Sequence, residues 1–188
     1  MSTIVVVRKD GKVVIAADTL TTCGNTKESA EYVVNHEKII TYKDNFLGIS
    51  GSASLQIAVQ NFLSKTKKKI SFEAIGNIYD FGLLLHTELK DKHFLRPDDE
   101  EDFETFRGDI LVANKHGIFG LSSYRYVQEY SKFYANGSGG VYALGAMFAV
   151  YKDDKKSAEE VAAIGVQAGT EFDDGSAAPI HTHSLNLK

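Results

Sequence analysis

Two hydroxyl residues, Ser2 and Thr3, directly follow Met1 and lead into the apolar run IVVV at 4–7. A serine hydroxyl is a poor nucleophile until a base removes its proton. The α-amine of a chain can be that base, because its pKa lies at about 7.7 to 8.0. If Met1 is removed, Ser2 carries nucleophile and base on one residue. This chemistry needs a rigidly held terminus, which immediate entry into a strand provides.

A predicted β-hairpin positions this terminus. The β-branched runs at 4–7 and 12–18 are joined by Asp10-Gly11, a dipeptide typical of tight hairpin turns. The stretch VVIAA in the second run is apolar without alternation. We therefore expect the second strand to be covered on both faces.

The rest of the chain is predicted to form a second hairpin, two helices, further strands, two more helices and a final strand. The second hairpin joins 38–43 to 46–50 across the turn residues Asp44 and Asn45. The apolar faces of the first two helices are Leu55, Ala58, Val59 and Phe62, and then Phe72, Ile75, Tyr79 and Leu83. The later elements are strands at 109–114, 117–123 and within 124–135, helices at 141–150 and after 157, and a strand at 180–187.

The last predicted helix has a clear start signal. Ser157 and Glu160 have the spacing of a capping box, and Val161, Ile164 and Ala168 would share one face of the helix that follows. No linker or internal repeat divides the sequence, so we expect a single domain over 1–188. Two sheets with helices outside them would cover every apolar face, which predicts an α+β fold.

Composition excludes several classes of partner. The chain has 188 residues, 43% of them hydrophobic, and a net charge of −4, which gives no reason to expect nucleic acid or an anionic membrane. The basic run KTKKK at 65–69 is interpreted as a solvated helix end rather than a nucleic-acid patch. The acidic run at 97–102 is interpreted as a solvated loop, because it lacks the ordered ligand pattern of a calcium loop.

Cellular location is also an expectation from composition. The lone Cys23 cannot form an internal disulfide, and CxxC pairs for zinc are absent, which fits a reducing compartment. No apolar stretch reaches the ~18 residues needed to span a bilayer, and the first residues do not have the pattern of a signal peptide. We therefore expect a cytoplasmic protein.

Several motifs together resemble a known family. These are STIVVVRKDGKVVIAAD at 2–18, Lys38, SGS at 50–52, GSGGVYALGAM at 137–147, AGTEF at 168–172 and HTHSL at 181–185. In this order they resemble the bacterial HslV peptidase and proteasome β subunits, N-terminal-nucleophile hydrolases with a four-layer αββα fold. The likeness covers essentially the whole chain. Within the family it is nearest to the bacterial proteasome homologues that are neither HslV nor the actinobacterial proteasome.

The resemblance implies a role for five residues. Ser2 would be the nucleophile, and a buried Asp18–Lys38 pair would keep an ammonium charged, lower the hydroxyl pKa and steer its proton toward the amine. The backbone N–H of Gly51 would face the developing oxyanion, and Ser138 would hydrogen-bond near the terminal amine. Taken alone, Asp18 is a polar strand end, Lys38 a surface lysine and Gly51 a turn glycine.

The sequence also departs from the family pattern. Ser2 stands where the family usually has threonine, so χ1 of the nucleophile is less restricted. Thr170 and Asp173 stand where proteasomes often carry an Asp and a Ser that support the amine, which predicts a different network there. Thr3 is an alternative nucleophile, but side chains alternate along a strand, so its hydroxyl would point to the wrong face.

The resemblance extends to a substrate pocket and to a cation. Leu20, Ile49 and either Val33 or Val34 would lie near the pocket for the residue before the cleaved bond, which suggests an apolar preference. A structural Na⁺ or Mg²⁺ could bind backbone carbonyls near Gly169, Phe172 and Gly175, and no cofactor is required.

Three functions follow as hypotheses. The leading one is a peptidase that cuts polypeptides inside stacked hexameric or heptameric rings, with an ATP-dependent unfoldase partner left open. The second is a ring-forming homologue that is catalytically inert and has a structural or binding role. The third is a small-amide hydrolase of the same superfamily, which would need a compact closed pocket instead of a chamber.

Overall fold

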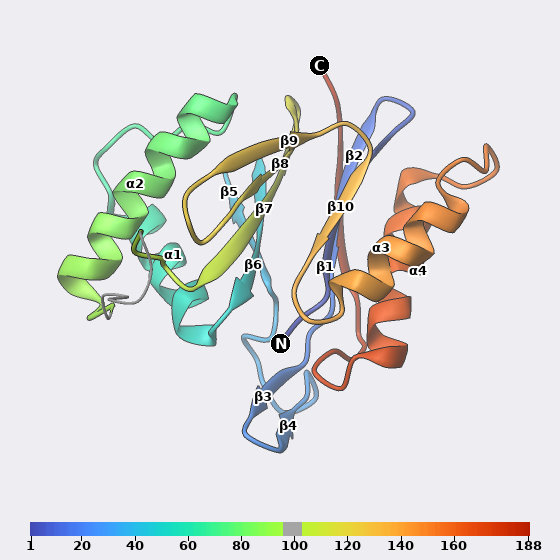
Figure 1. Cartoon of the computed structure of the whole chain (residues 1–188), viewed down its shortest axis with the longest axis horizontal. Helices are drawn as coiled ribbons and strands as arrows, with labels where there is room; N and C mark the ends of the chain where they lie inside the picture. Colours follow the sequence, from blue (N-terminus) through green and yellow to red (C-terminus); the bar gives the residue numbers. More distant parts are fainter. Residues whose placement is uncertain (96–102) are drawn as a thin grey trace.

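The computed structural model describes residues 1–95 and 103–188. Two antiparallel sheets lie face to face, and a pair of helices covers the outer face of each (Figure 1). This arrangement confirms the predicted four-layer αββα fold. The predicted acidic loop at 97–102 lies outside the described residues. Among the helices described, none is both long and apolar enough to cross a membrane.

The strands and helices are distributed over four layers. The four-stranded sheet has the order β10-β1-β2-β11, formed by Phe133–Asn136, Ile4–Lys9, Lys12–Ala17 and His181–Asn186. The five-stranded sheet has the order β5-β6-β7-β8-β9, formed by Ile39–Tyr42, Asn45–Gly51, Gly108–Asn114, Gly117–Leu121 and Val127–Tyr130. The helices are α1 (Ala53–Lys65) and α2 (Ile75–Lys92) on the five-stranded sheet, and α3 (Gly140–Val150) and α4 (Ala158–Phe172) on the other.

The first hairpin forms as predicted. Asp10 and Gly11 both have positive φ, 51° and 74°, as a tight two-residue turn requires. On β2, Val14 faces the core under α3 and α4, whereas Val13 and Ile15 face the core between the two sheets. The unbroken apolar run is therefore explained by burial on both faces.

The two sheets approach closely beside the start of β1. A Cβ atom at Gly48 of β6 would meet Ile4 Cγ2 at 2.5 Å, so only glycine fits there. Ser2 lies two residues before Ile4, and Gly51 lies three residues after Gly48 at the end of β6. In Figure 1 the start of β1 and the end of β6 both lie toward the lower end of the sandwich. This packing brings the first residues of β1 and the last residues of β6 to the same end of the molecule.

Two strand predictions need correction. The second hairpin turns at Lys43 and Asp44, because Asn45 is already paired with Tyr42 in the sheet. The Asn45 side-chain amide also donates to the Tyr42 carbonyl. The segment at 124–135 contributes two strands, β9 and β10, which belong to different sheets. A change from one sheet to the other leaves no periodic signal in the sequence.

A short hairpin was also missed. It joins β3 (Thr21–Cys23) to β4 (Thr26–Glu28) and extends from the lower end of the sandwich (Figure 1).

The predicted helical faces are right for one helix, wrong for one and partly right for a third. The predicted face of α1 is buried. On α2 the predicted Ile75, Tyr79 and Leu83 are exposed, and the predicted Phe72 is buried but lies before the helix. The buried face of α2 is Ile78, Phe81, Gly82, Leu85, His86 and Leu89. Both stripes of α2 are apolar at helical spacing, so periodicity could not choose between them. On α4, the capping box forms and Val161 is buried, but Ile164 and Ala168 are only half-buried.

Candidate active site

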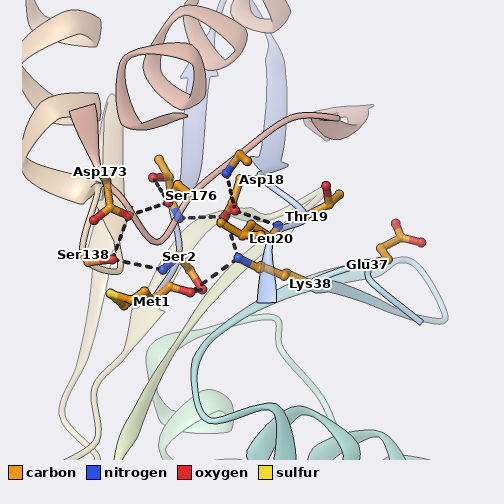
Figure 2. Close-up of polar contacts among 12 residues, drawn as sticks. Met1, Ser2, Asp18, Thr19, Leu20, Glu37, Lys38, Ser138, Asp173 and Ser176 are labelled. Atoms are coloured by element: carbon orange, nitrogen blue, oxygen red, sulfur yellow. Dashed lines mark hydrogen bonds and ion pairs between the residues drawn. The ribbon is translucent and has the colours of Figure 1, made fainter. Parts of the chain in front are cut away.

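Ser2 is held at its backbone by the loop between β10 and α3. The Ser2 N–H donates to Ser138 Oγ at 3.2 Å (Figure 2). The Gly139 N–H donates to the Ser2 carbonyl at 3.1 Å. The Ser2 hydroxyl donates to the Met1 carbonyl. Ser2 is buried, so its hydroxyl lies at a fixed position at the start of β1.

Asp18 and Lys38 form a buried ion pair beside this position. Lys38 Nζ donates to Asp18 Oδ1 at 2.7 Å, and both side chains are almost fully buried. Lys38 Nζ also lies 3.5 Å from the Met1 carbonyl oxygen, the same oxygen that the Ser2 hydroxyl contacts. The ammonium and the hydroxyl therefore converge on one carbonyl group.

The Asp18 carboxylate is fully satisfied. Besides the Lys38 ammonium it accepts three backbone N–H groups: Thr3 at 2.9 Å, Leu20 at 3.0 Å and Ala177 at 3.2 Å. Burial lowers the pKa of Lys38 from 10.5, and the Asp18 carboxylate opposes this through its charge and hydrogen bond. A lysine with a lowered pKa that still has a carboxylate partner is typical of functional sites.

A chain of hydroxyls and one carboxylate supports the Ser2 nitrogen. Ser138 Oγ donates to Asp173 Oδ2 at 2.9 Å, and Ser176 Oγ donates to the same oxygen at 2.6 Å. Thr170 takes no part in this network, because its hydroxyl donates to the Gln167 carbonyl of its own helix. Asp173 itself is the acidic member, and Ser176 is the serine that sequence reasoning missed. The spacing D-x-x-S after α4 was the available signal.

Thr3 lies on the other side of the strand, as expected. It is fully buried, and its hydroxyl is 2.8 Å from Ser176 Oγ. A Cβ at Gly139 or Gly169 would collide with the Thr3 side chain, so these glycines make room for it. Thr3 is thus an internal support for the network rather than a second candidate nucleophile.

Gly51 is the candidate site residue on the five-stranded sheet, whereas Ser2 leads into the four-stranded sheet. Gly51 ends β6 with a φ of 134° and directly precedes Ser52, the N-cap of α1. Within the described part of the chain, no hydrogen bond joins it to Ser2, Asp18, Lys38 or Ser138. It shares their end of the sandwich, so its oxyanion role stays a prediction.

A groove of about 720 Å³ borders the site. Val33 and Val34 line it, as expected for a substrate pocket. Leu20 and Ile49 do not, because they are 2% and 3% exposed within the protein core. The groove is therefore more polar than the sequence suggested.

The predicted cation ligands lie at the end of α4 and in the loop after it. The Gly169 carbonyl already accepts the Asp173 N–H at 2.9 Å, and Phe172 is the last residue of α4. A Cβ at Gly175 would collide with the Met1 side chain. In the described ranges, no group of three His, Cys, Asp or Glu residues is arranged to hold a metal. The carbonyl site stays a prediction.

The close contact between Gly169 and Thr3 leads to a stability prediction. Gly169→Ala is expected to destabilise the protein by about 1–3 kcal/mol, because the new methyl would collide with a buried β-branched side chain. Gly145→Ala on α3 is the matched control. A Cβ there meets nothing within 4 Å, and alanine favours helix by about 0.5–1 kcal/mol. Urea midpoints measure both, and equal midpoints would contradict the proposed contact.

Comparison with solved structures identifies the family. Two structures of Thiobacillus denitrificans BPH, one of them in complex with epoxomicin, are each 44% identical to this chain. Each match covers 99% of this chain and 98–99% of the other, with TM-scores of 0.95 without epoxomicin and 0.94 with it. The chain belongs to the proteasome β-subunit and HslV family.

More distant members share the fold alone. The eukaryotic HslV of Trypanosoma brucei is 22% identical over 98% of this chain and 99% of its own, with a TM-score of 0.67. No protein-family model matches the sequence, and no curated protein matches it. Membership in the proteasome and HslV family therefore rests on the full-length likeness to BPH.

Proposed function

We propose that the chain is a peptidase subunit that cleaves peptide bonds with Ser2 as its N-terminal nucleophile after Met1 is removed. The observation that carries this proposal is the convergence of the Ser2 hydroxyl and the Lys38 ammonium on one carbonyl oxygen. Asp18 accepts a hydrogen bond from the Lys38 ammonium, and Ser138 accepts one from the Ser2 nitrogen that would serve as the base.

The proposed reaction begins with proton transfer. The free α-amine of Ser2 takes the proton from Oγ while Oγ attacks the substrate carbonyl carbon, and the Lys38 charge favours the alkoxide form. The carbonyl oxygen becomes an oxyanion facing the Gly51 N–H, a donor worth about 2.7–4 kcal/mol in comparable sites. The C–N bond then breaks, and the amine returns the proton to the leaving nitrogen.

The acyl group is left as an ester on Ser2 Oγ. A water molecule attacks this ester, the same amine accepts the water proton, and the proton is returned to Oγ as the ester breaks. In the Met1–Ser2 peptide the nitrogen is an amide and cannot act as a base. Removal of Met1 is thus the step that supplies the base, and Ser138 then contacts a free amine.

The test uses protein whose intact mass shows that Met1 has been removed. It should cleave fluorogenic peptides, and epoxomicin, with which the 44% identical BPH was solved, should inhibit this turnover. If fully processed protein neither cleaves peptides nor binds epoxomicin, the peptidase proposal is wrong and a catalytically inert ring becomes the better hypothesis.

We also propose self-assembly into stacked rings, as the family resemblance implies. The helix α3 is apolar throughout, yet Val141 is 70% and Phe148 77% exposed. Tyr142 contacts Phe172 on α4, so the exposed apolar surface spans two helices. Such a surface is typical of a protein–protein interface. Mass measurement by light scattering and electron microscopy of the same peak test assembly, and a monomer would favour the small-amide hydrolase.

A further inference from the structure

The groove beside the site lies between two segments that adjoin candidate site residues. Glu37 and Ile39, the neighbours of Lys38, line one part, and Ala53, which closely follows Gly51, lines another. The substrate residue that carries the attacked carbonyl has its side chain next to that carbonyl. If Oγ attacks beside Lys38 and the oxyanion faces Gly51, this side chain enters the groove.

The groove is acidic. Its acidic lining residues are Glu28 and Glu37, and its lining contains no lysine or arginine from the described ranges. Lys38 does not neutralise it, because its ammonium points toward Asp18 and away from the Glu37 side chain (Figure 2). Glu37 is shared with two histidines of β11, 2.8 Å from His183 Nε2 and 3.6 Å from His181 Nδ1.

Glu28 differs from Glu37 because its carboxylate has no partner among the residues that the structure describes. It is half-buried at the end of β4, opposite Thr21, which also lines the groove. Within the part of the chain that the structure describes, no hydrogen bond or ion pair engages its side chain. A partly desolvated carboxylate without a cation gains by binding one.

We propose that this groove selects a lysine or arginine side chain in the substrate residue before the cleaved bond, and that Glu28 determines this specificity. The inference rests on the proposed peptidase function. Ile40 and Ile57 offer apolar contacts for the methylene stem of such a side chain, while the carboxylate binds its charged end. This basic preference differs from the apolar preference that Leu20, Ile49 and either Val33 or Val34 suggested, because only the two valines of that set line the groove.

The first experiment compares three fluorogenic peptides that differ only in the residue before the reporter: arginine, leucine or glutamate. Processed wild-type protein should cleave the arginine peptide at least tenfold more efficiently, in kcat/KM, than the glutamate peptide. Glu28→Gln should reduce the ratio of arginine to leucine about fivefold or more. Glu31→Gln is the matched control, because Glu31 is exposed on the neighbouring segment and does not line the groove. It should leave the ratio unchanged.

The second experiment separates this inference from the peptidase function. Fluorescence anisotropy measures binding of labelled arginine, leucine and glutamate peptides to the Ser2→Ala protein, which needs no turnover. Preferential binding of arginine that Glu28→Gln abolishes would support the groove assignment, even if no variant cleaves any peptide. Equal binding of the three peptides, or a preference that survives Glu28→Gln, would overturn it whether or not peptides are cut.

Discussion

Ser2→Ala, made in protein whose Met1 is removed, is expected to lower peptide turnover at least about a thousandfold. Alanine keeps the α-amine and the Asp18–Lys38 pair but removes the only oxygen that can form the acyl ester. The Ser2 side chain contacts the Met1 carbonyl rather than the protein core, so the fold and the assembly should be unchanged. Steady-state cleavage of a fluorogenic peptide measures the loss, and circular dichroism with size-exclusion chromatography checks the fold.

Ser2→Thr is the matched variant. It keeps the hydroxyl and adds the β-methyl that the family usually has at this position, which restricts χ1. We expect turnover within about tenfold of the parent. Thr3 cannot substitute for Ser2, because its hydroxyl is buried against Ser176 on the opposite side of the strand. Turnover by Ser2→Ala at the parental rate would therefore show that the nucleophile lies elsewhere.

The sequence predicted those parts of the fold that local signals determine. Asp10-Gly11 identified the first hairpin because both residues adopt positive φ, and Ser157 with Glu160 identified the start of α4. The buried face of α2 could not be predicted in the same way. Ile78 and Ile75 lie on competing apolar stripes, and only the position of the sheet decides which stripe is covered.

The candidate site was likewise predicted only in part from the sequence. Asp18 and Lys38 were found because family motifs mark them, and the structure places them in contact. Ser176 was missed because its role depends on the loop after α4, which returns it to Thr3 and Asp173. No periodic pattern in the sequence predicts these contacts of Ser176. The acidic groove was missed because Glu28, at the end of β4, and Glu37, just before β5, line one space only after the chain between them has folded.

Changes at the Asp18–Lys38 pair are expected to alter the pH dependence of turnover as well as its rate. In the proposed mechanism the Ser2 amine must be neutral and Lys38 charged. Turnover should therefore rise as pH passes the amine pKa of about 7.7–8.0 and fall as pH passes the Lys38 pKa. Burial lowers the latter below 10.5, so the fall should begin at lower pH than for an exposed lysine.

Asp18→Asn removes the charge that holds the Lys38 pKa up, while burial continues to lower it. The decrease in turnover at high pH should begin at a lower pH than in the parent protein. Turnover at neutral pH should drop by about a hundredfold because a smaller fraction of Lys38 is charged. Lys38→Met should be about as slow and lose the high-pH fall entirely. Asp44→Asn is the control, since its carboxylate is exposed in the β5–β6 turn. Profiles of kcat/KM from pH 6 to 11 separate these outcomes. A high-pH fall that stays in place in Asp18→Asn would mean that Lys38 is not the group whose deprotonation ends activity.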